Sequence, residues 1–458
     1  MLNDTIAAIA TGMTSAGIGI IRISGADAFA IADKVFISCH GEKASQFKTH
    51  TIHLGNIIRD DKALDEVLLT VMKAPHSYTG EDVVEINAHG GTYLLEIILK
   101  TVINAGARLA EPGEFTKRAF LNGKMDLTQA EAVMDLISSK NEYAVKNSME
   151  QLNGRLREKI DDLRERILHE TAYIEAALDD PEHFDLTAYP EELEQKVKLM
   201  LAEIERMTEL SKSGRIRKDG IRTAIIGKPN AGKSSILNML SGHETAIVTD
   251  IPGTTRDSIE ESVRLGELQL NLTDTAGIRD ADDEVERIGV EKALKIGNDS
   301  DLILFVVDSS IPLDDNDRKI MEMIKGKNVV VLFNKTDLEA VISVHDVLDL
   351  LGAVPVVEFS KNDEESDKRL EGVLKKLFIK KEISLNDESV MTNTRQLQEL
   401  MLAKSSLENV LKSIESLMAE DFFSIDLIDA YRHLGFIIGE EIDDDLANMI
   451  FSRFCMGK

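Results

Sequence analysis

The pattern of hydrophobic and polar positions divides the chain into regions with different expected secondary structure. Up to about residue 120, short apolar runs such as GIGIIRI, EVLLTVM and VVEINAHGG alternate with Gly, Pro and Asn breaks, which predicts a mixed α+β region. From about Leu127 to Met207, apolar residues recur at three- and four-residue steps, which is typical of amphipathic helices. Pro181 and Pro190 are expected to divide this stretch into two helices.

The pattern changes again in the second half of the chain. From about Gly220 to Lys375, β-rich apolar runs alternate with amphipathic segments, which predicts a parallel sheet with crossover helices. The helical pattern resumes from Asn393 to Phe454. The simplest topology is an α/β domain inserted into a helical domain whose two halves pack together. Two independent helical hairpins are the alternative, but each would bury little core.

We therefore predict a multidomain α+β protein. Its parts are an N-terminal α+β domain, a discontinuous helical domain and an inserted α/β domain. The expected boundaries are 1–120 for the N-terminal domain, 121–219 and 376–458 for the two helical halves, and 220–375 for the inserted domain.

Composition narrows the class of protein. Of its 458 residues, 43% are hydrophobic and 29% charged, and the net charge of −28 disfavours non-specific contact with nucleic-acid phosphates. A nucleic-acid partner would need a local basic patch or a second, basic protein. The two cysteines form no disulfide framework, and Asp4 stands where a signal peptide would carry basic residues. Apolar runs such as LILFVV are too short to span a bilayer, so we expect a soluble cytoplasmic protein without membrane contact.

A glycine-bounded loop lies between a predicted strand and a predicted helix of the middle region. Gly227-x-x-x-x-Gly232-Lys233-Ser234 matches the phosphate-binding loop in sequence and in context. The glycines let backbone N–H groups surround phosphates, Lys233 can reach the β- and γ-phosphates, and the Ser234 hydroxyl can bind Mg²⁺. An ordinary glycine-rich turn would need neither the lysine nor the hydroxyl.

Further motifs indicate which nucleotide binds. In LNLTDTAG, Asp274 can hold Mg²⁺ through water and Gly277 can offer its N–H to the γ-phosphate. The buried run VVVLF leads into Asn334-Lys335-x-Asp337, whose carboxylate can accept hydrogen bonds from both N1–H and the 2-amino group of guanine. In this order, each after its own predicted strand, the motifs favour GTP over ATP.

The hydrolytic machinery departs from that of Ras-like enzymes. Ile278 stands where those enzymes place a water-orienting Gln, so another group must orient the attacking water. In the loop TDIPGTTRD, Thr255 resembles the switch threonine that completes the Mg²⁺ shell. The loop carbonyls and the amide of Asn230 can bind a monovalent cation beside the phosphates. Glu286 is a candidate base for water activation, and a solvated helix face is an equally good interpretation of it.

Several stretches together carry a family resemblance. IVTDIPGTTRD, DTAGIRDADDEVERIGVEKA and the ending FCMGK resemble the MnmE, or TrmE, family of tRNA modification GTPases, and the resemblance covers essentially the whole chain. That family ends in Cys-(aliphatic)-Gly-Lys, which Cys455 to Lys458 fit. A prenylation box is excluded because Gly457 is not aliphatic and no polybasic segment precedes it. Without the resemblance, Cys455 would be interpreted as a small buried hydrophobe, and the role of its thiol stays open.

The resemblance implies a set of site residues. It places a 5,10-methylene- or 5-formyl-tetrahydrofolate on the N-terminal domain, similar to folate-binding domains, with contacts from Arg22, Glu85, Lys124 and Lys458. It implies Mg²⁺ at Ser234 and Thr255, K⁺ at Asn230, Thr249, Ile251 and Thr254, and catalytic roles for Glu286, Cys455 and Lys233. With the motifs, it implies these GTP contacts: Asn230, Ala231, Gly232, Lys233, Ser234, Ser235, Thr249, Asp250, Ile251, Pro252, Gly253, Thr254, Thr255, Asp274, Thr275, Ala276, Gly277, Asn334, Lys335, Thr336, Asp337 and Ser360.

The resemblance also implies a biological role. Members form homodimers that join an FAD-dependent partner, MnmG, in a heterotetramer. Together they install an aminomethyl or carboxymethylaminomethyl group at C5 of the wobble uridine of certain tRNAs, with folate supplying the carbon. K⁺-dependent GTP hydrolysis drives the conformational cycle. Because this chain is acidic, we expect most tRNA contact through the complex.

The sequence departs from the usual motifs of the family at two places, and one rival interpretation of its function stays open. The family's usual Ser-Ala-Lys motif is here Ser360-Lys361, and the prolines usual before GIIRISG are missing from GMTSAGIGIIRISG. The rival is a regulatory GTP switch in ribosome assembly or signalling, without one-carbon chemistry. Such a protein would need neither Arg22, Glu85 and Lys124 nor the Cys-Met-Gly-Lys ending.

Overall fold

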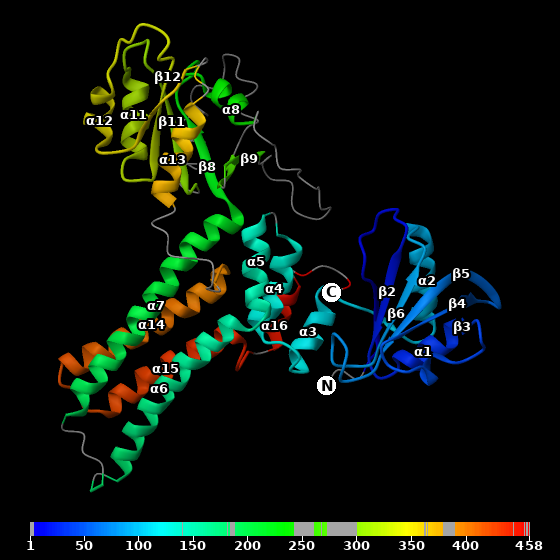
Figure 1. Cartoon of the computed structure of the whole chain (residues 1–458). Helices are drawn as coiled ribbons and strands as arrows, with labels where there is room; N and C mark the ends of the chain where they lie inside the picture. The colour runs from blue at the N-terminus through cyan, green and yellow to red at the C-terminus, as the bar shows by residue number, and fades with distance from the viewer. Residues whose placement is uncertain are drawn as a thin grey trace. The chain divides into compact units, whose positions relative to one another are not determined.

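We describe the computed structural model of the chain, which forms two compact units (Figure 1). The first unit contains Met1–Ser138, Val145–Ile204 and Thr394–Lys458, and the second contains Ser139–Ala144 and Glu205–Asn393. The residues described are 4–139, 141–180, 182–183, 188–241, 261–266, 268–272, 300–360, 363, 365–378, 390–442, 444–452, 454 and 457.

The N-terminal part of the first unit is built on a seven-stranded sheet. Its strands lie in the order β3-β4-β5-β6-β2-β1-β7, and all neighbours are antiparallel except β1 and β7. The strands are β1 (Ile6–Ile9), β2 (Gly19–Ser24), β3 (Phe36–Ser38), β4 (Thr51–Arg59), β5 (Lys62–Met72), β6 (Val83–Ala88) and β7 (Arg108–Leu109).

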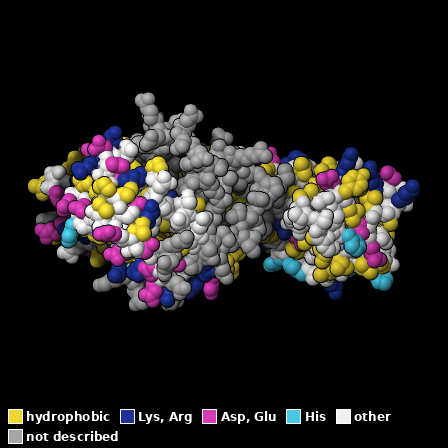
Figure 2. All heavy atoms as spheres, turned by 90° about the horizontal axis from the view of Figure 1, so that it is seen from above, with side chains coloured by type: hydrophobic (Ala, Val, Ile, Leu, Met, Phe, Trp, Pro, Cys, Tyr) yellow, Lys and Arg dark blue, Asp and Glu magenta, His cyan; other side chains and the backbone are white. Residues whose placement is uncertain are grey.

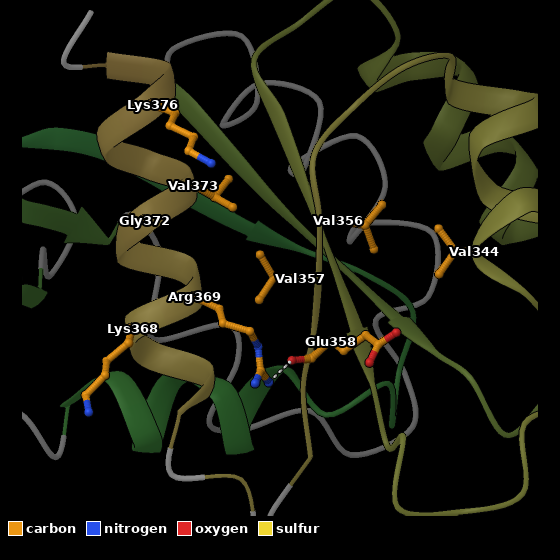
Figure 3. Close-up of a pocket in the computed structure, with 9 residues that line it drawn as sticks. All are labelled: Val344, Val356, Val357, Glu358, Lys368, Arg369, Gly372, Val373 and Lys376. Atoms are coloured by element: carbon orange, nitrogen blue, oxygen red, sulfur yellow. Dashed lines mark hydrogen bonds between the residues drawn. The ribbon is translucent and has the colours of Figure 1, made fainter. Parts of the chain in front are cut away.

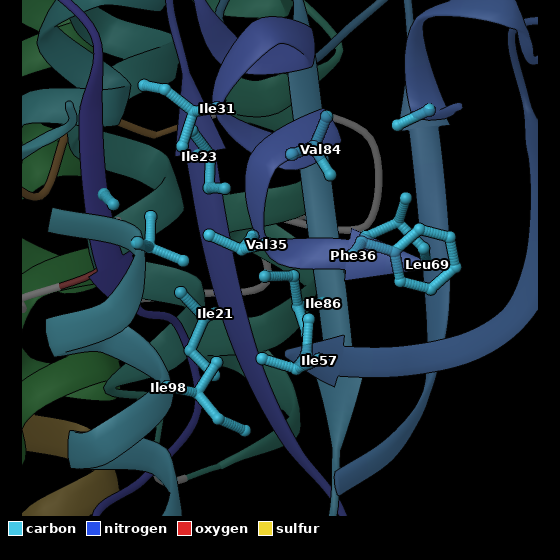
Figure 4. Close-up of a cluster of buried hydrophobic side chains, with 14 of the residues drawn as sticks. Ile21, Ile23, Ile31, Val35, Phe36, Ile57, Leu69, Val84, Ile86 and Ile98 are labelled. Atoms are coloured by element: carbon cyan, nitrogen blue, oxygen red, sulfur yellow. The ribbon is translucent and has the colours of Figure 1, made fainter. Parts of the chain in front are cut away.

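Helices cover one face of this sheet. Alternation along β2 turns Ile21 and Ile23 inward, and they pack against Ile31 of α1 (Ala28–Val35) and Ile98 of α2 (Thr92–Asn104), as Figure 4 shows. A short 3₁₀ turn, η1 (Ala44–Gln46), lies beside this core. The sequence pattern therefore determines which face of each strand is buried.

The opposite face of the sheet carries exposed hydrophobic side chains. Ile37, Ile52, Leu54 and Leu68 are 45% to 63% exposed. The strand register places Leu54 opposite Leu68, so these side chains share one face. An apolar sheet face of this kind is uncommon in a monomer.

Helices from two distant parts of the sequence form the rest of the first unit. Helix α15 (Asp421–Ile438) packs against α14 (Thr394–Glu415), α6 (Arg155–Asp179) and α4 (Leu127–Ile137). The two helical halves thus share one core, as the insertion topology requires. The short helices α3 (Glu114–Leu121) and α16 (Asp444–Phe451) pack against each other.

The expectation of two helices between Leu127 and Met207 is wrong, because the described residues of this stretch form four. Besides α4 and α6 there are α5 (Glu142–Leu152) and α7 (Tyr189–Asp219). Gly154 lies between α5 and α6 and has a φ of +83°, a backbone conformation that favours glycine. The break predicted at Pro181 and Pro190 agrees with the boundary between α6 and α7, although Pro181 itself lies outside the described residues. Pro190 stands in the first turn of α7, where its missing N–H costs nothing.

The second unit has a six-stranded sheet in the order β13-β12-β11-β8-β10-β9, parallel except for β9. Its strands are β8 (Ile221–Ile226), β9 (Glu261–Leu265), β10 (Leu268–Leu272), β11 (Leu302–Asp308), β12 (Val329–Asn334) and β13 (Val356–Glu358). Its helices are α8 (Lys233–Ser241), α11 (Asp315–Ile324), α12 (Val344–Leu351) and α13 (Ser366–Phe378).

Helices lie on both faces of this sheet. Residues of α8 and α13 belong to one hydrophobic cluster, and residues of α11 and α12 belong to another on the other face. The fold class predicted from the sequence is confirmed: an N-terminal α+β domain, a discontinuous helical domain and an inserted Ras-like α/β domain. The boundaries at residues 120, 219 and 375 stay predictions. None of the described helices is both long and apolar enough to cross a membrane.

Candidate functional site

The phosphate-binding loop connects strand β8 to helix α8. Because β8, β11 and β12 are parallel neighbours, their carboxyl ends meet at one edge of the sheet. That edge brings the loop before Lys233 next to the motif that begins at Asn334. Ligands of α/β sheets bind at such an edge, so the two predicted parts of the nucleotide site lie together.

Gly232 and Asn334 are in close contact within this site. Asn334 Nδ2 donates a 2.9 Å hydrogen bond to the carbonyl oxygen of Ala231. Gly232 has a φ of +102°, and a Cβ atom there would clash with the side-chain nitrogen of Asn334. Glycine is therefore required at position 232 both by the backbone conformation and by the neighbouring side chain.

Lys233 is held by the loop that precedes it. Its Nζ donates 2.7 Å hydrogen bonds to the carbonyl oxygens of Gly227 and Lys228. Burial lowers the pKa of Lys233, because desolvation disfavours the charged form. An anionic ligand would offset this desolvation by supplying an opposite charge, as expected of a phosphate-binding lysine.

The guanine motif is connected to the segment that carries Ser360. Both the backbone N–H and the hydroxyl of Thr336 donate to the carbonyl oxygen of Phe359, at 3.2 and 3.1 Å. Ser360 therefore lies beside the Asn-Lys-Thr-Asp motif, and Asp337 is exposed at the same end. The predicted grouping of these residues agrees with this geometry, and their contacts with a base stay predictions.

Asp308 is a residue of this edge that sequence reasoning missed. It ends strand β11 and accepts a 2.6 Å hydrogen bond from Nζ of Lys335. Burial alone would raise the pKa of Asp308, but hydrogen bonds from Lys335 and Ser310 outweigh it and lower the pKa. The available signal was an acidic residue at the end of a buried strand, before a second buried strand that leads into a motif containing a lysine.

A second group of predicted residues lies on the open face of the N-terminal sheet. Arg22 and Glu85 are register partners on β2 and β6, and Arg22 Nε lies 2.7 Å from Glu85 Oε1. The guanidinium carbon of Arg22 lies 5.4 Å from the ring centre of Tyr78 and 5.6 Å from that of Phe115. Sequence reasoning did not select these two aromatic residues, because only the fold brings them to Arg22.

Lys124 lies beside the loop that carries Tyr78. Its Nζ donates a 3.1 Å hydrogen bond to the carbonyl oxygen of Pro75, and its side chain lies against Gly80. The structure therefore brings Arg22, Glu85 and Lys124 around one loop.

A buried network of charges holds α3, which carries Phe115. Arg118 of this helix is 2% exposed and donates to Asp4, Glu81 and Glu114. Burial alone would raise the pKa of Glu114, but hydrogen bonds from Arg108, the backbone of Glu111 and Arg118 outweigh it and lower the pKa. The network fixes α3 against the sheet and so positions Phe115 beside Arg22.

The end of the chain lies against the first strand. Gly457 is buried with a φ of +84°, and a Cβ atom there would overlap the carbonyl oxygen of Ile9 and lie 2.8 Å from Cα of Ala10. Ile9 follows Ala8, which is the register partner of Arg22. Gly457 of the Cys-Met-Gly-Lys ending therefore reaches the strand next to the one that carries Arg22.

Two family models match this chain and between them span nearly its whole length. The model of the MnmE helical domain matches residues 127–455, and the model of the TrmE N-terminus, a GTP-binding protein, matches residues 5–124. The chain belongs to the MnmE family of tRNA modification GTPases. The family predicted from the sequence is confirmed.

Full-length relatives agree with this assignment to the MnmE family. The tRNA modification GTPase MnmE of Lachnoclostridium phytofermentans is 52% identical over 459 residues, which cover 100% of both chains. The proteins of the same name from Bacillus licheniformis and Bacillus subtilis are 45% and 44% identical, covering 99% of this chain and 100% of each relative. Because the similarity includes both ends of the chain, the rival interpretation as a switch GTPase without those parts is not supported.

Other predicted residues lie outside the described part of the chain. They are Thr249, Asp250, Ile251, Pro252, Gly253, Thr254, Thr255, Asp274, Thr275, Ala276, Gly277, Glu286, Cys455 and Lys458. Of the predicted metal ligands, Asn230 and Ser234 are described and exposed, and both offer the oxygen atoms that K⁺ and Mg²⁺ prefer. Within the described ranges, no group of three or more His, Cys, Asp or Glu residues is arranged to hold a metal ion.

A groove of about 620 Å³ lies elsewhere in the second unit, between β13 and α13 (Figure 3). Val357 and Val373 line it, and Arg369 donates to the carbonyl oxygen of Glu358. None of the predicted site residues lines this groove.

Proposed function

We propose that this chain is a K⁺-dependent GTPase that acts, with an FAD-dependent partner of the MnmG type, in modifying C5 of the wobble uridine of certain tRNAs. The observation that carries the proposal is full-length identity of 52% to a tRNA modification GTPase. The meeting of the phosphate loop and the guanine motif at one sheet edge supports the nucleotide assignment.

In the proposed reaction, the second unit binds and hydrolyses GTP. Lys233 would neutralise charge on the β- and γ-phosphates, and Asp337 would accept hydrogen bonds from guanine. Ser234 and Thr255 would hold Mg²⁺, and Asn230 with Thr249, Ile251 and Thr254 would hold K⁺. These ions would stabilise negative charge that develops on the transferred phosphoryl group. Glu286 would then assist the attacking water.

The N-terminal domain is proposed to bind 5,10-methylene- or 5-formyl-tetrahydrofolate. Arg22 and Glu85 offer a paired cation and carboxylate, which suit the donors and acceptors at the edge of a pterin. Phe115 and Tyr78 add aromatic surface beside them. Lys124 and Lys458 would bind the acidic glutamate tail, and Cys455 would lie near the folate carbon, since Gly457 contacts the neighbouring strand.

A homodimer through the open face of the N-terminal sheet is part of this proposal. Register partners on neighbouring strands form one row across β4, β5, β6 and β2, namely Ile52, Thr70, Glu85 and Arg22. The exposed apolar residues and the proposed folate contacts therefore share one face of the sheet. Pairing two copies there would cover the apolar side chains and enclose the folate site.

The charge distribution supports a basic partner for tRNA contact. On the face that Figure 2 shows, described Lys and Arg side chains are interspersed with Asp and Glu instead of forming one basic patch. With a net charge of −28, this chain is proposed to contact tRNA mainly within the MnmG complex.

A comparison of salts tests the nucleotide part of the proposal. GTP turnover by the full chain is expected to be much faster in KCl than in NaCl at equal ionic strength. Cells that lack this chain are expected to lose the C5 group of the wobble uridine, measured by mass spectrometry of tRNA nucleosides. Equal turnover in both salts would refute the proposed K⁺ dependence of GTP hydrolysis. Intact wobble uridines in those cells would refute the proposed role in tRNA modification.

Replacing Glu85 with Gln is expected to weaken binding of 5-formyl-tetrahydrofolate on the order of 10-fold or more, because a charged hydrogen-bond acceptor is lost. Isothermal titration with the full chain measures this. Glu66→Gln is the matched control, since Glu66 lies on the same open face of β5 and is exposed. Equal affinity for both variants would contradict the folate assignment of Glu85.

A further inference from the structure

The phosphate-binding loop contains a second lysine, Lys228, whose side chain points to a different partner from that of Lys233. Its Nζ lies 2.6 Å from Oδ2 of Asp317 and 3.2 Å from Oδ2 of Asp314. Both carboxylates belong to the start of helix α11, on the face of the sheet opposite α8. Lys228 therefore joins the loop to a helix that supplies none of the predicted nucleotide contacts.

This attachment is largely buried and geometrically fixed. The Lys228 side chain is 11% exposed and that of Asp317 is 1% exposed. Oδ2 of Asp317 also accepts a 3.1 Å hydrogen bond from the backbone N–H of Asp314, while Oδ1 of Asp314 accepts from the N–H of Asp317. Each carboxylate thus accepts a hydrogen bond from the backbone N–H of the other residue, in a capping box that does not depend on Lys228. The ammonium binds to two carboxylates that the capping box positions, of which Asp317 is buried and Asp314 is 52% exposed.

The backbone of the same residue holds the phosphate lysine. The carbonyl oxygen of Lys228 accepts a 2.7 Å hydrogen bond from Nζ of Lys233 and a 3.3 Å bond from the N–H of Ala231. The far arm of the loop is fixed separately, because Asn334 donates to the carbonyl oxygen of Ala231. The loop is therefore attached at both arms, to α11 through Lys228 and to β12 through Asn334.

We propose that Lys228 is a positioning residue of the nucleotide site, which anchors the first arm of the phosphate loop to Asp314 and Asp317 so that the Gly227 and Lys228 carbonyls hold the ammonium of Lys233 at the phosphates. This inference rests on the proposed function, since it assigns the loop to a nucleoside di- or triphosphate. Lys228 acts through Lys233 and makes no contact with the ligand itself.

Replacing Lys228 with Met keeps the aliphatic stem and removes the ammonium. Affinity for GDP is expected to fall on the order of 10- to 100-fold, the range typical when an outer partner of a ligand-holding side chain is lost. Lys228→Arg should restore most of the affinity, because a guanidinium can reach both carboxylates. Lys319→Met, on an exposed position of α11, is the matched control and should bind GDP normally.

A double-mutant cycle with Lys233→Met separates positioning from other effects. If Lys228 acts through Lys233, then Lys228→Met should have little further effect on GDP affinity in a chain that already carries Lys233→Met. An electrostatic effect of the unpaired carboxylates, or a general loss of folding, would instead weaken binding equally in both backgrounds and overturn the inference. Fluorescence titration with a labelled GDP measures all four proteins.

The controls also separate this inference from the proposed function. If the unmodified chain bound neither GDP nor GTP, the proposed function would fail. If the unmodified chain bound GDP and Lys228→Met bound it with the same affinity, only the positioning role would be refuted. A normal melting temperature for Lys228→Met, together with weak binding, would support the inference because it excludes unfolding as the cause.

Discussion

Replacing Gly457 with alanine is expected to reduce wobble-uridine modification on the order of 100-fold, while GTP hydrolysis stays unchanged. The added methyl group would overlap the Ile9 carbonyl oxygen, and alanine would be strained at a φ of +84°. Residue 457 would have to move away from strand β1, and a misplacement of about 1 Å in a reacting group can cost about this factor. In the proposed arrangement, Cys455 and Lys458 would then no longer reach the folate site.

The measurement is mass spectrometry of wobble uridines from cells whose own copy is replaced by the variant, with GTP turnover measured on the purified chain. Gly41→Ala is the matched control, since Gly41 has a φ of +75° and no atom lies within 4 Å of the added methyl group. Normal modification by Gly457→Ala would show that the contact of Gly457 with β1 has no role in the reaction.

Replacing Gly232 with alanine is expected to weaken GTP and GDP binding by roughly 30-fold at the least. Strain at a φ of +102° costs about 1–3 kcal/mol, and displacing Asn334 leaves the buried Ala231 carbonyl unpaired at about 1–3 kcal/mol more. The free loop would relax to avoid both costs, and nucleotide binding would have to restore the strained form. The lower limit of about 2 kcal/mol corresponds to that factor in Kd.

Equilibrium binding of labelled GDP and GTP measures the effect of Gly232→Ala. Gly326→Ala provides the comparison within the same unit, because Gly326 has a φ of +83° and nothing lies within 4 Å of its missing Cβ. It should lower the melting temperature slightly and leave both affinities intact. If Gly232→Ala and Gly326→Ala lost the same affinity for GDP and GTP, backbone strain alone would explain the loss. That result would contradict the role of Asn334.

The sequence was most informative where the chemistry lies in one short, continuous segment. A phosphate loop is a strand, a turn and the first turn of a helix, so the spacing of Gly227, Gly232 and Lys233 already specifies the geometry. The order of the motifs along a parallel sheet then places Asn334 at the same edge. Helix boundaries were less predictable, because Gly154 interrupts an otherwise continuous apolar pattern.

By itself, the sequence determined the class of nucleotide and the insertion of one domain into another, since these depend on local spacing and hydrophobic period. The family followed from the resemblance of several quoted stretches. Only the tertiary structure decided which distant groups meet. Strand register pairs Arg22 with Glu85, helix packing brings Phe115 to them, and the fold lays Gly457 on the first strand. The partner of Lys228 likewise depends on how α11 packs on the sheet. Such contacts arise from the packing of whole elements, which no short segment of sequence encodes.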